Sequence, residues 1–455
     1  MSMRSEIKHL WQNSKTYRAL LTATAVYTVL RLVVQGVVIA VMLFPEAGIM
    51  GGVPAWVDVE GPVVPADLQI YLNAAKNLSA RQDLYLQGSL ERLEDHYPYA
   101  PSFALAFVPF LWLSPVGVSV VHTLLHFVAY GIMYFSWGRI FKRLNLERAA
   151  KMLTWTLPVW LVFSSFWTDL GYLNIYIIIA LFATLLIEAV LREHLGWSLL
   201  WLSVILQIKP HWAFAVAVPL LLGRKRFFFR LLALTAVGYI VITGITILIV
   251  GPAYGWGQYR DYVAFLGRLS RDFPWRGPEM AFLGYNHSIK QIVVYGLGVS
   301  QETLRLATVV KVLLLIPLGV TCLRHLLHPV NCRGDEEPQL GLDFAFALYL
   351  GAFIWLDMVW ELSLGVALYP YLLGTTQQRF VRTWLHIGFL PYALLDPWRV
   401  GSLVFGGMNV ILPGPYVATD PAIYMPMIMA TILMLYVVLV ARLWRAAPVQ
   451  RLAGV

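Results

Sequence analysis

Long runs of apolar residues recur along the whole chain and are separated by short polar segments. Most of these runs are long enough to cross the roughly 30 Å of hydrocarbon in a bilayer as a helix. The pattern predicts an all-α fold, a polytopic transmembrane helical bundle with about 11 to 13 spans. The sequence contains no convincing internal repeat or second domain, so residues 1–455 are expected to form a single integral membrane domain.

The expected crossing segments, in order, are 19–44, 116–137, 152–166, 175–191, 227–250, 304–322, 342–356, 363–373, 383–395 and 422–441. Three further apolar segments, 101–113, 197–208 and 212–222, are too short to cross comfortably as straight helices. The first of these is expected to dip into the outer leaflet. The other two are expected to be short or broken helices joined by the charged turn Lys209-Pro210-His211. A tight turn is expected at 168–174.

Basic residues gather in alternate connections, as at 139–151 and 224–226. Because short cytoplasmic loops are enriched in Lys and Arg, these connections and both termini are expected to be cytoplasmic. Two large loops, residues 45–100 and 251–302, are then expected on the extracytoplasmic face. This arrangement predicts a multi-pass protein of the cell (inner) membrane, with its site on the outer face.

Composition agrees with this class of protein, because 59% of the residues are hydrophobic and only 13% are charged. The mean hydropathy of +0.67 excludes an ordinary soluble domain. The net charge of +9 comes mostly from the basic loops and does not indicate a nucleic-acid partner. Two cysteines, Cys322 and Cys332, allow neither a disulfide framework nor a metal cluster. Asp58 and Glu60 resemble an acidic metal pair, but no other ligands lie near them in the sequence, so no metal is expected.

The first large loop contains a short helix with one apolar side, formed by Ile70, Ala74 and Leu78. Such a helix is expected to lie along the membrane surface, as a juxtamembrane element of the outer face. Asp67, which follows Pro65, is expected at its N-cap position. One interpretation is that Asp67 only caps the helix. The other is that it is a functional carboxylate, kept ionised by the helix N-terminus.

Three other polar features are expected on the same face as Asp67. They are Lys209 with His211, the sequence Asn286-His287-Ser288, and the segment 357–361, which contains Trp360 and Glu361. A charge at the membrane edge indicates function, because burying it is costly. Each feature also has a plainer interpretation: Lys209 as a snorkelling lysine, Glu361 as an interface charge and His287 as a hydrogen-bonding loop residue.

Arg31 and Gln35 lie one helical turn apart within the first span and face the same way. Arg31 falls near the middle of that span, so it is expected to face the bundle interior or a hydrated cavity. Both a structural pairing and a contact with a phosphate group stay open for it. The aromatic residues of 254–275 have two similar interpretations, stacking on sugar faces or lying at the membrane interface.

Several short motifs, in this order, resemble those of the polytopic GT-C glycosyltransferases, and most closely glycosyltransferase family 87, the polyprenyl-phosphate-mannose-dependent α-mannosyltransferases. The motifs are Ala66-Asp67-Leu68-Gln69-Ile70-Tyr71 with Ala74-Ala75, Asp83-Leu84-Tyr85, Tyr97-Pro98-Tyr99-Ala100-Pro101, Gly171-Tyr172-Leu173-Asn174, Lys209-Pro210 and Asn286-His287-Ser288. The resemblance extends over most of the chain. It implies a GT-C-type bundle that uses a lipid-linked sugar.

The resemblance implies that Asp67 is the catalytic base. The chain departs from the family where a histidine is expected after a late tryptophan, because it has Trp360-Glu361-Leu362. Glu361 and His287 are the candidates to replace that histidine. The donor phosphate is expected to bind Lys209 and Arg31, since cations stabilise its growing charge. The expected substrate-binding residues are Tyr71, Asn174, His211, Asn286 and Trp360.

These features predict an enzyme that moves a sugar from a polyprenyl-phosphate donor to a glycolipid or glycan acceptor. Mannose is the favoured sugar. The expected reaction is an inverting displacement that needs a general base and no cofactor or metal. One alternative is a GT-C transferase for arabinose, aminoarabinose or glucose. Another is a transporter or flippase of lipid-linked substrates, which more often carries its polar groups near mid-membrane. The partners expected are the lipid donor, the acceptor and the bilayer, with no nucleic acid.

Overall fold

The computed structural model describes residues 3–44, 64–85, 97–273, 275–278, 286–327, 336–406 and 421–446. Every regular element in these residues is a helix, which confirms the all-α prediction. Among them, six helices have the length and apolar composition to cross a membrane, so the chain is a multi-pass membrane protein. They are α2 (Lys15–Leu43), α5 (Pro115–Arg143), α12 (Lys225–Val250), α15 (Gln301–Leu327), α16 (Glu336–Trp355) and α20 (Pro421–Ala446).

The remaining helices are shorter. They are α1 (Met3–Asn13), α3 (Ala66–Ser79), α4 (Pro101–Phe107), α6 (Glu147–Trp155), α7 (Leu157–Val162), α8 (Ser164–Tyr172), α9 (Tyr176–Leu191), α10 (Leu195–Ile208), α11 (Val218–Leu221), α13 (Pro252–Asp272), α14 (Ile289–Leu297), α17 (Gly365–Thr375), α18 (Arg379–Ala393), α19 (Leu395–Gly406) and the 3₁₀ helices η4 (Val108–Trp112) and η5 (Pro210–Ala217). The expected 11 to 13 spans included several of these shorter apolar helices.

The centre of the bundle is α9, which is apolar on every side and almost entirely buried. A helix that is apolar all round belongs inside a protein, and α5, α10, η5 and α16 pack around it. The peripheral helices α2 and α12 bury only a few side chains, so their apolar surfaces face the lipid. Close packing depends on small residues: a Cβ added to Gly374 of α17 would lie 2.4 Å from the Ala149 backbone of α6.

The apolar block after Tyr97 has the expected break. Ser114 caps α5 by accepting a hydrogen bond from the Gly117 backbone N–H, and Pro115 occupies the first turn, where its missing N–H costs nothing. The short helices α4 and η4 precede this break and together are too short to span a bilayer. The predicted division into a short element and one long span is therefore confirmed.

Two sequence expectations are wrong in detail. The segment 152–166 is not one continuous helix, because it is divided among α6, α7 and α8. Pro158 lies at the start of α7, and Phe163 has an extended backbone between α7 and α8. The turn expected at 168–174 is much shorter, since α8 continues to Tyr172. The chain reverses at Leu173, which has the left-handed φ of 50°.

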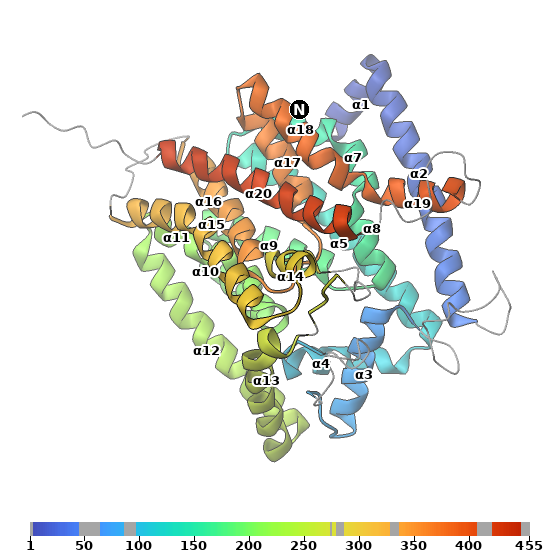
Figure 1. The fold of residues 1–455 in the computed structure, drawn as a ribbon, viewed down its shortest axis with the longest axis vertical. Helices are drawn as coiled ribbons and strands as arrows, with labels where there is room; N and C mark the ends of the chain where they lie inside the picture. Colours follow the sequence, from blue (N-terminus) through green and yellow to red (C-terminus); the bar gives the residue numbers. More distant parts are fainter. Residues whose placement is uncertain are drawn as a thin grey trace, which may run out of the picture.

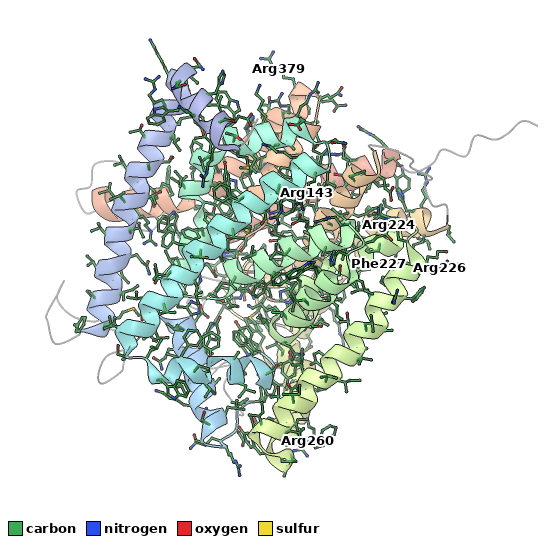
Figure 2. All side chains as sticks on the ribbon, turned by 180° about the vertical axis from the view of Figure 1, so that it is seen from behind. Arg143, Arg224, Arg226, Phe227, Arg260 and Arg379 are labelled. Atoms are coloured by element: carbon green, nitrogen blue, oxygen red, sulfur yellow. The ribbon has the colours of Figure 1, made fainter. Side chains whose placement is uncertain are left out.

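Helices α3, α4 and α13 lie together at one end of the molecule, and α1, α17 and α18 lie at the other end (Figure 1). Figure 2 shows Arg260 of α13 at the far end of α12 from Arg224 and Arg226, which precede and begin that helix. Residues 224–226 and helix α13, which come from sequence segments expected on opposite faces, thus lie at opposite ends of α12.

Candidate active site

A cavity of about 620 Å³ opens beside α3, α4 and α13, and this volume is in the range that encloses a small organic ligand. Its lining comes from segments far apart in the sequence. The polar residues that line it are Asp67, Tyr71, Tyr99, Asn174, Tyr176, Lys209, His211, Tyr262, Lys290, Thr308, Lys311 and Asp357. Trp355 and Trp360 add aromatic surface, while residues of α13 add apolar surface. The cavity is therefore mostly apolar, with charged groups at two places.

The first charged place, the Asp67 cluster, consists of Asp67, Tyr71, Asn174 and Lys209. Helix α3 holds the first two side chains one turn apart, and its apolar residues pack into the core. The Tyr71 hydroxyl donates to the Asn174 side-chain oxygen at 2.8 Å and lies 3.1 Å from the Tyr99 hydroxyl. These contacts fix the helix that carries Asp67 against the turn that carries Asn174.

The N-cap expectation for Asp67 is wrong, because the cap position is Pro65 and no side chain caps the helix. Asp67 lies in the first turn and keeps only 9% of its surface exposed. Burial raises the pKa of its carboxyl above the ordinary value. Lys209 opposes this shift, Asp169 adds to it, and the Asn174 amide opposes it. A raised pKa differs from the expectation that the helix N-terminus keeps Asp67 ionised, because burial disfavours the charged form.

The turn below Asp67 is held by Asp169 and His126. The Asp169 carboxylate accepts hydrogen bonds from the backbone N–H groups of Tyr176 and Ile177, at 3.2 and 2.8 Å, and so caps α9. His126 Nε2 lies 3.2 Å from that carboxylate and 2.5 Å from the Asn174 carbonyl oxygen. These two residues position Asn174 and are buried beneath the cavity.

Lys209 follows α10 and precedes η5, so it lies at the turn between these two short helices, as the sequence indicates. Its ammonium lies 3.7 Å from the centre of the Tyr176 ring and 5.2 Å from that of Tyr99. Cation–π contacts of this kind hold a buried ammonium in place. Lys209 is largely buried, and the charges that act on it are those of Asp67 and, less strongly, Asp169. It is therefore a constituent of the Asp67 cluster and not a snorkelling lysine.

The second charged place, the lysine cluster, consists of Lys290, Lys311 and Asp357. Lys290 Nζ donates to Asp357 Oδ2 at 2.7 Å, and Lys311 donates to the other carboxylate oxygen. The three residues come from α14, α15 and the connection between α16 and α17. One carboxylate thus bridges two ammonium groups at the surface of the cavity.

Asn286 supports the lysine cluster through contacts with the backbone around Asp357. Its side-chain amide donates to the Asp357 carbonyl oxygen at 2.9 Å and accepts from the backbone N–H groups of Val359 and Ser288, at 3.2 and 3.0 Å. The His287 backbone N–H donates to the Val359 carbonyl oxygen at 2.8 Å. These contacts hold the backbone of residues 357–359 in place. Asn286 itself is not among the described residues that line the cavity.

The other predicted site residues divide between the cavity and its surroundings. Trp360 and His211 line the cavity. His287 and Glu361 are buried outside it: burial lowers the pKa of His287 to about 3, and Glu361 accepts a hydrogen bond from the Tyr392 hydroxyl at 2.8 Å. The two candidates for the missing histidine therefore do not line the cavity that contains Asp67.

Arg31 also lies away from the described cavity lining. Its guanidinium pairs with Asp396 at 3.0 Å and donates to the Gln35 side-chain oxygen at 3.1 Å. Tyr27 donates its hydroxyl to the same Asp396 carboxylate at 2.5 Å. Of the two interpretations given for Arg31, this geometry favours structural pairing between α2 and α19.

In the described residues, no group of three or more His, Cys, Asp or Glu side chains has the arrangement to hold a metal ion. Asp58 and Glu60 lie outside the described residues. The sequence interpretation missed Lys311, Lys290, Asp169 and His126. A signal for Lys311 was present, since it is a lone lysine inside the apolar run 304–322.

An all-α membrane bundle whose cavity holds carboxylates, lysines and aromatic rings is characteristic of a membrane enzyme that acts on a polar substrate. A comparison with known families agrees and is more specific: the model of glycosyltransferase family 87 matches residues 97–356. The chain belongs to glycosyltransferase family 87 and is a membrane glycosyltransferase. No curated protein and no solved structure matches it. The match includes Lys209, Lys290 and Lys311, while Asp67 precedes it.

Proposed function

We propose that the protein transfers a sugar, most favourably mannose, from a polyprenyl-phosphate donor to a glycolipid or glycan acceptor on the extracytoplasmic face. The family supports the reaction class. The observation that carries the proposal is a buried carboxylate, Asp67, in a cavity of about 620 Å³ that has aromatic surfaces and cations. A sugar needs aromatic faces, its phosphate needs cations, and the acceptor hydroxyl needs a base.

Asp67 is the proposed general base. In an inverting displacement, the acceptor oxygen attacks the anomeric carbon from the side opposite the phosphate, while the base removes the acceptor proton. A raised pKa makes the carboxylate a stronger base than an ordinary aspartate. Asp357, the other carboxylate among the described lining residues, is engaged by two lysines and is less suited to accept a proton.

The remaining lining residues have proposed supporting roles. Tyr71 and Asn174 fix the position of Asp67, His211 and Trp360 contact the sugar or the acceptor, and Lys209 maintains the charge of the base. The catalytic roles of Glu361 and His287 stay predictions from the sequence. The outer-face position of the cavity follows from the basic loops and is part of the proposal.

Purified protein in lipid nanodiscs tests this function directly. It is incubated with synthetic polyprenyl-phosphate mannose, glucose, arabinose or aminoarabinose and with a glycolipid extract, and products are identified by mass and anomeric configuration. We expect transfer from the mannose donor with inversion. Asp67→Asn keeps the size of the side chain but cannot take a proton, so transfer should fall by about 10²–10⁴-fold. Transfer by Asp67→Asn at the wild-type rate would exclude Asp67 as the base.

A further inference from the structure

The lysine cluster is held rigidly from several directions. Besides the Asp357 contacts, the Lys290 ammonium lies 5.3 Å from the centre of the Trp275 ring, and the Lys311 ammonium lies 5.5 Å from that of Trp355. Asn286 fixes the backbone of Asp357. Two ammonium groups that share one carboxylate and lie beside aromatic rings form a preorganised place for an anion.

The position of Lys311 suits an anion with a hydrocarbon chain. Lys311 and Thr308 line the cavity from α15, one helical turn apart, and α15 is long and apolar enough to cross a membrane. Lys311 lies ten residues after Gln301, the first residue of α15, which is roughly 15 Å along the helix. Apolar lining of the same cavity comes from Leu266 and Leu269 of α13 and from Phe273, which follows that helix. One cavity therefore offers cations for a charged head group and apolar surface for a hydrocarbon chain.

The charged groups that act on Asp67 differ from those that act on Lys311. The charges that act on Asp67 are those of Lys209 and Asp169, whereas those that act on Lys311 are Asp357 and Lys290. Among the described residues that line the cavity, three lysines accompany two carboxylates. Since Lys209 belongs to the Asp67 cluster, the lysine cluster is the place where an added anion meets two cations.

We propose that Lys290 and Lys311 bind the phosphate of the lipid donor, and that Lys209 acts on Asp67 instead. This inference rests on the proposed function. The acceptor oxygen forms a bond to the anomeric carbon, the bond from that carbon to the phosphate oxygen breaks, and its electron pair stays on the phosphate. The acceptor proton moves to Asp67. The phosphate changes from a diester with one negative charge to a monoester with a greater charge, which the two ammonium groups stabilise.

In-line displacement separates the base from the leaving group, and this explains the division. The base must reach the attacking hydroxyl, while the phosphate lies on the opposite side of the anomeric carbon. A cation next to the base is on the side of the attacking hydroxyl. The lysine cluster lines the same cavity from other segments of the chain, so it offers cations that do not accompany the base.

Binding of a synthetic polyprenyl phosphate to the purified full-length protein in nanodiscs tests the assignment. The variants are Lys290→Gln and Lys311→Gln, each of which leaves Asp357 with one lysine, so no bare carboxylate remains. Lys76→Gln, an exposed lysine of α3, is the matched control. Polyprenol without phosphate and inorganic phosphate are measured in parallel to separate the chain from the head group. Thermal unfolding reports whether each variant is folded.

We expect each glutamine variant to weaken polyprenyl phosphate binding about tenfold or more, because it loses a charge-assisted contact. Lys290→Arg and Lys311→Arg, which keep the charge, should retain most of the affinity. Lys76→Gln should bind normally, and Lys209→Met should bind within about threefold of wild type. Polyprenol binding should not change in any variant, and inorganic phosphate should bind weakly at the same lysines.

The results that would overturn the inference can be told apart from one another. Normal polyprenyl phosphate binding by folded Lys290→Gln and Lys311→Gln, with loss in Lys209→Met, would return the phosphate to Lys209 and leave the proposed function intact. If the wild-type protein neither binds polyprenyl phosphate nor transfers sugar from it, the inference and the proposed function both fail. If the glutamine variants do not fold, loss of polyprenyl phosphate binding in the folded arginine variants would contradict the inference. Full competition of polyprenyl phosphate binding by polyprenol would contradict it as well.

Discussion

The two charged clusters of the cavity contain similar residues but are built differently. In the Asp67 cluster, the carboxylate is buried and faces one lysine and the amide of Asn174. In the lysine cluster, Asp357 bridges two ammonium groups. Burial makes a carboxylate a better base, whereas contact with cations makes it a weaker one. The comparison teaches that the surroundings of an aspartate, more than its presence in a cavity, determine which chemistry it supports.

The supports of the clusters differ as well. The Asp67 cluster rests on side-chain contacts with Tyr71 and on the turn capped by Asp169. The lysine cluster rests on the contact of the Asn286 side chain with the backbone of Asp357, which lies between α16 and α17. A change in either support should therefore affect one function more than the other.

Replacing Lys209 should produce the largest effect of the variants that sharpen this comparison. Its ammonium favours the ionised form of Asp67, so Lys209→Met should raise the Asp67 pKa further. Below that pKa, each unit of upward shift lowers the ionised fraction about tenfold. Transfer at neutral pH should fall about tenfold to hundredfold, and the acidic limb of kcat against pH should move to higher pH. Turnover measured across pH is the check.

The direction in which the pH profile shifts distinguishes two roles for Lys209, an effect on the Asp67 pKa and binding of the donor phosphate. A base must be ionised, so activity is lost as pH falls through the Asp67 pKa, and a higher pKa moves that loss to higher pH. Lys209→Arg keeps the charge and should keep the wild-type profile. An unchanged pH profile with a raised KM for the donor would instead support the sequence prediction that Lys209 binds the phosphate.

Replacing Asn286 should have a smaller effect, and only on the lysine cluster. Asn286→Ala leaves two backbone N–H groups and one carbonyl oxygen without their amide partner. The unsatisfied groups should lower the free energy of unfolding by about 1–3 kcal/mol and weaken polyprenyl phosphate binding about tenfold. Asn286→Asp keeps the acceptor oxygen and should recover part of both losses. Lowered turnover with unchanged phosphate affinity would contradict the role given to Asn286.

Replacing Arg31 should have the smallest effect on the reaction. Arg31→Met leaves Asp396 without its guanidinium partner, which should cost about 3–5 kcal/mol of stability for a buried pair. The folded fraction should bind polyprenyl phosphate and transfer sugar within about twofold of wild type. Thermal unfolding and binding are measured on the same preparation. Lost phosphate affinity at normal stability would place Arg31 in the donor site.

The sequence predicted much of the fold, since apolar runs and basic loops are local features. It indicated α3, the break at Ser114 and the turn at Lys209. It failed where the backbone bends inside an apolar run, as at Pro158, because packing decides whether such a run continues as one helix.

The candidate site was predictable in part. Asp67, Tyr71, Asn174, Lys209, His211 and Trp360 were named from the sequence, and the structure brings all of them to one cavity, although their roles stay predictions. Partners distant in sequence were not predictable. Arg31 was recognised as an unusual charge, but Asp396 is 365 residues away. In the same way, no local sequence pattern connects Lys311 to Asp357, and none indicates that Asn286 holds the backbone of Asp357.

The central claim is that the base and the phosphate site are separate, and the affinity of Asp67→Asn for polyprenyl phosphate tests it most directly. The substitution removes the negative charge of the base and leaves the lysine cluster intact. We predict a dissociation constant within about threefold of wild type, in the same preparation that loses about 10²–10⁴-fold in turnover. A dissociation constant that changes as much as the turnover would contradict it, because Asp67 and the phosphate would then share one site.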